Sequence, residues 1–138
     1  MSIPNAIEYD GHLIGGQPSA TQYKLVSIEG YRTVISMRSM KEPGAAAAKA
    51  QAEDAGLNFV SIPVEGIDDF NRENAEALEK ALKGEGPFVV HCQSGGRVAA
   101  LFALKCGWCD GKSVDQAIEE GHKMGLGGLE PAIRKLLR

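Results

Sequence analysis

The sequence predicts an α/β domain whose central sheet is mainly parallel and is covered by helices on both faces. Short apolar runs typical of buried strands alternate along the chain with longer segments of high helix propensity. Glycine or proline separates most of these segments. The length of 138 residues suits one such domain, spanning residues 1–138, but not two.

The first 30 residues read as a hairpin followed by a helix. Residues 6–14 alternate in character around Asp10-Gly11, a pair that favours a two-residue type I′ turn, and therefore predict a short antiparallel edge hairpin. Ser19 and Gln22 have the spacing of a capping box. The helix that they begin is expected to end before Gly30.

The middle of the chain predicts two strands, each followed by a helix. Residues 33–37 are β-branched and apolar, typical of a central strand, and residues 58–64 alternate like a second strand. The alanine-rich segment 44–55 has high helix propensity. Residues 71–83 repeat apolar side chains at helical spacing and predict an amphipathic helix.

The remainder of the chain predicts one more strand and three helices. Residues 87–90 are an apolar run that leads into a glycine-rich turn, and residues 98–104 have the composition of a buried helix. A second capping box predicts a helix over residues 113–122. A glycine-rich hinge at 124–128 and a short helix at 129–137 complete the expected order.

Composition narrows the partners of the chain. Hydrophobic residues make up 43% and charged residues 24%, and the net charge of -3 provides no general attraction for nucleic acid or an anionic membrane. No apolar segment approaches the ~20 residues that a membrane span needs, and the N-terminus lacks the features of a signal peptide. Three cysteines are too few for a disulfide framework. We therefore expect a cytoplasmic protein with no nucleic-acid or membrane partner.

The stretch from His91 to Arg97 carries the chemistry. Cys92 lies where the predicted strand turns into a helix. A glycine-rich turn at this position directs backbone N–H groups inward, and the helix dipole adds positive potential. The turn therefore predicts an anion-binding loop made of Gln93, Ser94, Gly95 and Gly96.

Cys92 is predicted to be a nucleophile. A helix N-terminus beside a cationic group stabilises the thiolate form of a cysteine, and only the thiolate is nucleophilic. The planar guanidinium of Arg97 suits a tetrahedral oxyanion, and His91 is expected to support the loop. The alternative is an inert buried cysteine, which is the usual outcome for an arbitrary cysteine. The combination of Val-His-Cys, two glycines and an arginine favours the reactive one.

These residues carry a family resemblance. The run Val90–Gly95 resembles the active-site loop of dual-specificity tyrosine phosphatases, in which five residues separate the cysteine from the arginine. Four residues lie between Cys92 and Arg97, a length that resembles the loop of rhodanese sulfurtransferases. With residues 16–19 and 34–38, nearly the whole chain is similar to the bacterial DUF442 family, the phosphatase-like domain of beta-lactamase hydrolase-like proteins. The resemblance implies a three-layer dual-specificity-phosphatase-like fold and frequent association with sulfide-oxidising enzymes.

Two further sets of charged residues are candidates for the site. Arg38 follows a predicted central strand, at the sheet edge where ligands bind in α/β folds, and could hold an anion or remain solvated. Glu65, Asp68 and Asp69 crowd the loop that in a phosphatase supplies the general acid. The alternative for these carboxylates is stabilisation of the next helix N-terminus.

A second cysteine pair, Cys106-Gly107-Trp108-Cys109, superficially resembles the thioredoxin redox motif. Cys106 is expected to close a helix and so to face the negative end of the dipole, which disfavours a thiolate. Two cysteines are also too few for a zinc site. We predict packing and a turn at Gly107, with a resolving or metal role as the alternative, and no metal or cofactor.

Three functions remain open at this stage. In the first, Cys92 takes sulfur from thiosulfate or a persulfide and passes it to a thiol or cyanide. The short loop favours a small sulfur species, and Val98 replaces the hydroxyl residue that helps phosphatases to release phosphocysteine. In the second, Cys92 hydrolyses phosphate esters. The third is a non-catalytic domain that binds and reads an anion. The expected partners are a small anionic substrate (thiosulfate, persulfide or phosphate ester) and, for sulfur transfer, a thiol acceptor.

Overall fold

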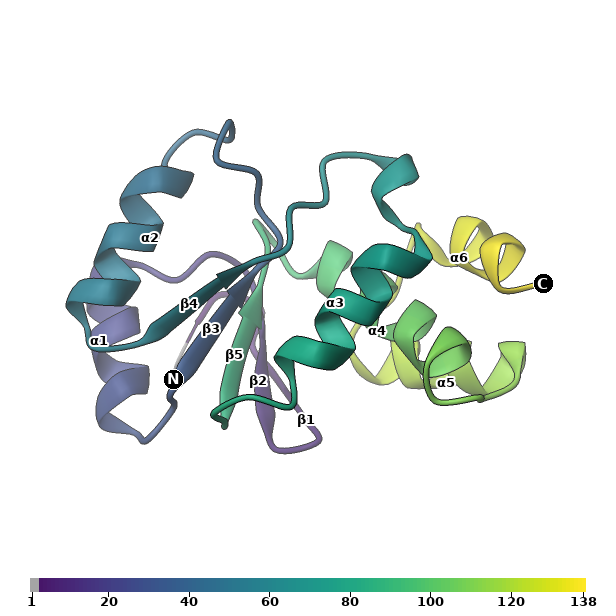
Figure 1. Cartoon of the computed structure of the whole chain (residues 1–138), viewed down its shortest axis with the longest axis horizontal. Helices are drawn as coiled ribbons and strands as arrows, with labels where there is room; N and C mark the ends of the chain where they lie inside the picture. Colours follow the sequence, from purple (N-terminus) through teal and green to yellow (C-terminus); the bar gives the residue numbers. More distant parts are fainter. Residues whose placement is uncertain (1–2) are drawn as a thin grey trace.

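The computed structural model describes residues 3–138 and shows a five-stranded sheet between two layers of helices (Figure 1). The strand order is β1-β2-β5-β3-β4; β1 is antiparallel to β2, and all other pairs are parallel. The mainly parallel sheet predicted from the sequence is therefore confirmed. The strands are β1 (Ile7–Tyr9), β2 (His12–Gly15), β3 (Thr33–Ser36), β4 (Asn58–Ser61) and β5 (Phe88–His91).

The helices divide between the two faces of the sheet (Figure 1). Two cover one face: α1 (Ala20–Ile28) and α2 (Ala45–Asp54). The other face carries α3 (Arg72–Ala81) and α4 (Gly96–Trp108), with α5 (Val114–Lys123) and α6 (Glu130–Leu137) packed against α4. A short 3-10 helix, η1 (Ile67–Asp69), follows β4. This three-layer arrangement is the one expected.

The two faces of the sheet belong to separate hydrophobic clusters. Successive residues of a strand point to opposite faces. In β3, Val34 packs with Tyr23 and Val26 of α1, whereas Ile35 packs with the helices of the other face. Because both faces are covered, the inner strands are apolar without a polar alternation, as parallel strands usually are.

Capping and turn residues behave as the sequence indicates. Asp10 (φ 52°) and Gly11 (φ 81°) both have positive φ, as a type I′ turn requires, and they join β1 to β2. Ser19 and Ser113 each form a complete capping box, at the start of α1 and of α5. The hairpin and both helix starts are confirmed.

Two predicted boundaries are wrong. The strand predicted to reach Val64 ends at Ser61, because Pro63 has no N–H for the ladder. Main-chain bonds from Ile62 to Ser36 (2.8 Å) and from Val64 to Met37 (2.9 Å) still hold the segment beside β3.

The turn predicted at Gly107 is also absent, because α4 runs from Gly96 to Trp108. Leu137 of α6 packs so closely on Gly107 that an added Cβ would lie 2.4 Å from Leu137 Cδ2. The glycine serves helix packing rather than a turn.

The glycine-rich segment 124–128 connects α5 to α6. Met124 and Leu126 are buried in the larger core, and Gly125 has a positive φ of 89°. None of the helices within residues 3–138 is long and apolar enough to cross a membrane.

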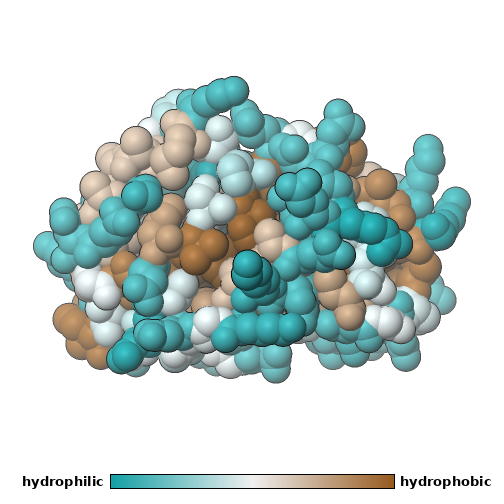
Figure 2. Space-filling model, in the orientation of Figure 1, coloured by the Kyte–Doolittle hydropathy of each residue, from teal (hydrophilic) through white to brown (hydrophobic). Residues whose placement is uncertain are grey.

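Figure 2 shows an apolar area on the face over the outer strand β4, between the two helical layers. Phe59 and Val60 of this strand are half-buried. The functional site lies elsewhere, at the carboxyl ends of the strands.

Candidate active site

The site forms where the inner parallel strands end. Cys92 follows β5, and Met37 and Arg38 follow the neighbouring β3, so the topology brings them to one edge of the sheet. Cys92 is only 1% exposed. Its backbone N–H donates to Gly15 O of β2 at 3.3 Å. A substrate could therefore reach the sulfur only with a small terminal group.

The loop after Cys92 wraps around the sulfur. The backbone N–H of Gly95 donates to Cys92 Sγ at 3.0 Å. Gly95 has a left-handed φ of 109°, which glycine adopts at little cost and other residues rarely adopt. The turn that aims this N–H at the sulfur therefore depends on glycine.

Contacts with the N-terminal segment hold the outer side of the loop. Gln17 N donates to Gln93 O at 3.1 Å, and Asn5 Nδ2 donates to Ser94 O at 2.9 Å. A Cβ on Gly16 would lie 2.7 Å from Gln93 O, so this close approach requires glycine. The early Gly16-Gln17 pair thus shapes the loop across the sheet.

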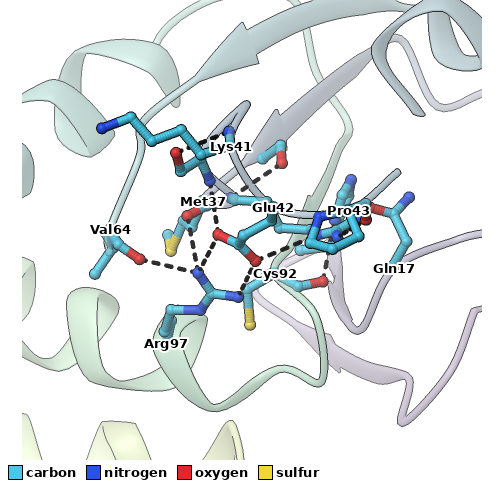
Figure 3. A network of polar contacts seen from close by, with 12 residues as sticks. Gln17, Met37, Lys41, Glu42, Pro43, Val64, Cys92 and Arg97 are labelled. Atoms are coloured by element: carbon cyan, nitrogen blue, oxygen red, sulfur yellow. Dashed lines mark hydrogen bonds and ion pairs between the residues drawn. The ribbon is translucent and has the colours of Figure 1, made fainter. Parts of the chain in front are cut away.

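Arg97, in the first turn of α4, is held by a carboxylate (Figure 3). Its Nη1 donates to Glu42 Oε2 at 2.9 Å, and its Nη2 donates to Glu42 Oε1 at 3.0 Å. Nη1 also donates to Val64 O at 2.9 Å and approaches Met37 O at 3.4 Å. The bond to Arg97 lowers the pKa of Glu42 to about 2, and the same bond raises the pKa of Arg97.

The remaining donors of Arg97 form a free edge. A guanidinium has five N–H groups. Within residues 3–138, Nε–H and the second Nη2–H donate to no oxygen, and these two groups point along the same edge of the plane. Figure 3 shows the sulfur of Cys92 beside the guanidinium, and a hydrogen bond with this side chain adds to the raised pKa of Arg97 after the larger effect of Glu42. Glu42 therefore fixes Arg97 while leaving room for two oxygens of an anion next to Cys92.

Arg38 is buried, with 5% exposure, and contacts the Glu42 carboxylate that holds Arg97. It donates to Gln17 Oε1 (2.6 Å), to Pro43 O (2.6 Å) and, more weakly, to Glu42 Oε1 (3.3 Å). Its position is thus beside the carboxylate that holds Arg97 rather than in a solvated loop. The geometry favours a role in fixing Glu42 over direct contact with substrate.

A second chain of hydrogen bonds reaches Cys92 from the other side. Gln17 Nε2 donates to the hydroxyl of Tyr23 at 3.0 Å, and that hydroxyl lies 2.8 Å from His91 Nε2. His91 Nδ1 lies 3.3 Å from Cys92 O. Because the Tyr23 oxygen accepts from Gln17, its proton is available for Nε2, which leaves Nδ1–H to donate to the Cys92 carbonyl.

Burial fixes the charge states in this second chain. It lowers the pKa of His91 to about 4, so the imidazole is neutral near pH 7, and it raises the pKa of Tyr23 to about 12. Gln17 joins the two chains, because its Oε1 accepts from Arg38 while its Nε2 donates to Tyr23. One network therefore runs from Arg97 to the backbone of Cys92.

The three acidic candidates lie in the loop after β4. Glu65 and Asp68 are exposed. Asp69 Oδ2 accepts from Glu65 N at 2.7 Å, and Asp68 O accepts from Asn71 Nδ2 at 2.9 Å. Asp69 thus shapes its own loop, whereas Glu65 lines a hollow that Arg97 also lines.

The other cysteines lie at the far end of α4. Cys106 is buried and Cys109 half-buried, and burial raises the pKa of both thiols. Within residues 3–138, no group of three or more His, Cys, Asp and Glu side chains gathers as a metal site would require.

Sequence reasoning gave no role to three residues of the network, Gln17, Tyr23 and Glu42. Glu42 follows Arg38 by four residues in a polar loop, a spacing compatible with an ion pair, but nothing local connects it to Arg97. Tyr23 looks like an ordinary apolar residue of α1. Its hydroxyl is the only local signal, because buried tyrosines usually need a hydrogen-bond partner.

Comparison with known proteins identifies the family of the chain. Residues 17–108 match the family model of the beta-lactamase hydrolase-like protein, phosphatase-like domain. The chain is 34% identical over 96 residues to a beta-lactamase hydrolase-like protein of Xylella fastidiosa, and 30% identical over 95 residues to one of Agrobacterium fabrum. Each alignment covers 66% of this chain but only 22% of the relative.

Solved structures share the fold. A candidate phosphatase of Neisseria meningitidis is 25% identical, has a TM-score of 0.78, and is covered to 96% in both chains. A candidate phosphatase of the DUF442 family from Shewanella putrefaciens is 20% identical, with a TM-score of 0.71 and coverage of 99% of this chain and 88% of that one.

Pseudomonas aeruginosa TpbA in complex with phosphotyrosine is 17% identical, with a TM-score of 0.61 and coverage of 96% and 94%. The fold is therefore that of tyrosine-phosphatase-like proteins. With its cysteine loop, its held arginine and the match over residues 17–108, the chain belongs to the family of phosphatase-like domains found in beta-lactamase hydrolase-like proteins.

Proposed function

We propose that this domain is a cysteine-dependent sulfurtransferase, in which Cys92 accepts a sulfur atom from a small anionic donor and passes it to a thiol or cyanide. The Cys92 thiolate attacks the outer sulfur of thiosulfate, the S–S bond breaks, and sulfite leaves with the electron pair. The free Nε/Nη2 edge of Arg97 would bind the sulfonate oxygens. Attack by cyanide on the outer sulfur of the Cys92 persulfide then gives thiocyanate and regenerates the thiolate.

The observation that carries this proposal is the short loop, with four residues between Cys92 and Arg97. It offers fewer inward N–H groups than a longer loop would, and the N–H of Gly95 is already directed at the sulfur at 3.0 Å. The position after Arg97 is Val98, fully buried in the core and without a hydroxyl. Sulfite also leaves without a general acid, which suits a loop whose Asp69 is engaged with the backbone of Glu65.

The second candidate is hydrolysis of phosphate monoesters through a phosphocysteine. The comparisons favour it over sulfur transfer, because the family is described as phosphatase-like and a structural neighbour, TpbA, binds phosphotyrosine. Cys92 would take the phosphoryl group and Arg97 would hold two of its oxygens. Glu65, which lines the same hollow as Arg97, would protonate the leaving oxygen. Both candidates need the same nucleophile and the same small anionic substrate.

Two assays on the purified chain separate them. With thiosulfate and cyanide we expect thiocyanate, and with p-nitrophenyl phosphate we expect little product. Phosphate release at ordinary phosphatase rates, without thiocyanate, would contradict the first proposal and support the second. Neither product, together with sulfate or phosphate retained by the loop, would support a domain that only binds anions.

A further inference from the structure

An apolar hollow of about 220 Å³ adjoins the site at Arg97. Val64 and Ile67 from the loop after β4, Phe70 before α3 and Leu129 before α6 form its walls. Glu65 and Gly66 complete the lining. Transfer of sulfur from thiosulfate does not use these apolar walls, because thiosulfate has no apolar part.

The hollow and the anion site share one side chain. Arg97 lines the hollow and also stands beside the sulfur of Cys92 (Figure 3). A molecule bound to Arg97 by its anionic end can therefore extend its remainder toward the hollow. Continuity with the anion site, rather than apolarity alone, identifies the occupant as part of the substrate.

The size and charge of the hollow restrict that occupant further. A cavity of about 150 Å³ with apolar walls can hold benzene, so about 220 Å³ is enough for a group of phenyl size. The carboxylate of Glu65 disfavours a second negative charge, and Arg97 is already engaged by Glu42. Ile67 is 52% exposed although it is large and apolar, so one wall remains open to a ligand.

We propose that this hollow binds the apolar, non-reacting group of the substrate, so that the domain acts on organic anions with an aromatic or branched aliphatic group rather than on inorganic thiosulfate alone. The inference rests on the proposed function of Cys92 and Arg97. Within sulfur transfer, the substrate class is an organic thiosulfonate. The Cys92 thiolate attacks the outer sulfur, the S–S bond breaks, and the organic sulfinate leaves with the electron pair.

The test compares benzenethiosulfonate with methanethiosulfonate, which share the reacting S–S bond and differ in the organic group. We expect kcat/KM to be roughly tenfold or more higher for the phenyl donor, since several additional apolar carbons gain contact with the walls. Ile67→Ala, which shortens one wall without adding a charge, should narrow this preference by lowering kcat/KM for the phenyl donor more than for the methyl donor. Ile28→Ala is the matched control, because Ile28 lies on α1 across the sheet and is 81% exposed.

A binding measurement separates failure of the inference from failure of the proposed function. In the Cys92→Ser variant, calorimetry should show tighter binding of benzenesulfonate than of methanesulfonate, without any chemistry. That preference, combined with a wild-type chain that transfers no sulfur, would support the hollow and contradict the sulfurtransferase. Sulfur transfer with equal kcat/KM for the two donors, in the wild type and in Ile67→Ala alike, would overturn the inference and leave the proposed function intact.

Discussion

The two ends of helix α4 place the same side chain in opposite surroundings. Cys92 lies in the loop before the helix, where a backbone N–H points at its sulfur and Arg97 stands beside it. Cys106 and Cys109 lie at the C-terminal end, where burial raises the pKa of both thiols and nearby carboxylates add to the effect. The stability of a thiolate therefore depends on the helix end and on its polar neighbours, not on the presence of a cysteine pair.

Replacing Cys92 by serine should cause the largest loss of activity, and replacing a cysteine at the other end of α4 should cause almost none. Cys92→Ser should reduce thiocyanate formation by about 10³-fold or more, because Cys92 is the nucleophile that carries the transferred sulfur in the proposed reaction. Cys109→Ser should stay within about twofold of the wild type, since its thiol does not enter the network. Comparable losses in both variants would contradict the difference in reactivity between the thiols at the two ends of α4.

Removing the charge of Glu42 tests how the N-terminal end of α4 is held. Glu42→Gln is expected to lower kcat/KM by about 10–100-fold, because Arg97 loses its bidentate partner and its free edge shifts relative to Cys92. Glu53→Gln, at an exposed carboxylate of α2 that pairs with Lys49, is the matched control and should leave kcat/KM unchanged. An unchanged kcat/KM in Glu42→Gln would contradict the role given to Glu42.

Glu42 also gives the N-terminal end of α4 its own acid sensitivity. Its pKa in the fold, about 2, is below the ordinary value of 4.5, so the stability it contributes is present above pH 4.5 and is lost as the pH falls toward 2. The free energy of unfolding of Glu42→Gln should lie below that of the wild type near neutral pH, with the gap closing in this window. A gap independent of pH would show that the carboxylate charge is not what stabilises the loop.

His91 should produce a separate pH effect of moderate size. Its pKa in the fold is about 4 against an ordinary value of 6.5, so the unfolded chain binds the proton first, and stability falls as the pH drops from 6.5 toward 4. At pH 5 the loss relative to pH 8 should be about 2 kcal/mol. Denaturant titrations of the wild type and of His91→Gln would check it: the variant should lack this slope, and an equal slope would assign it to other groups.

The smallest effect is expected from the hydroxyl of Tyr23. Tyr23→Phe should lower kcat/KM about threefold and the free energy of unfolding by about 1 kcal/mol, because His91 Nε2 and Gln17 Nε2 each lose a partner. Tyr31→Phe, a half-buried tyrosine outside the network, provides the control. Equal effects of the two substitutions would mean that the hydroxyl does not position the loop.

The sequence predicts the parts of the fold that depend on local signals. Asp10-Gly11, Ser19 and Ser113 each specify their turn or cap through neighbours a few residues away, and the structure confirms them. The end of α4 could not be predicted in the same way, because Gly107 stays helical through a contact with Leu137. Local propensity does not contain that contact.

The site divides along the same line. Its loop is contiguous, so Cys92 and Arg97 can be recognised from their spacing. The groups that hold the loop are distant in sequence: Glu42 is 55 residues from Arg97, and Tyr23 is 68 from His91. Only the parallel pairing of β3 with β5 and the packing of α1 on the sheet bring them together.

The most direct test of sulfur transfer through Cys92 is the mass of each cysteine-containing peptide after incubation with thiosulfate. Trypsin separates Cys92, in residues 84–97, from Cys106 and Cys109, in residues 106–112. We expect the first peptide alone to gain about 32 Da, the mass of one sulfur atom, and cyanide to reverse this gain. An unmodified first peptide, or sulfur gained on the second, would contradict the claim that the N-terminal end of α4 carries the reactive thiol.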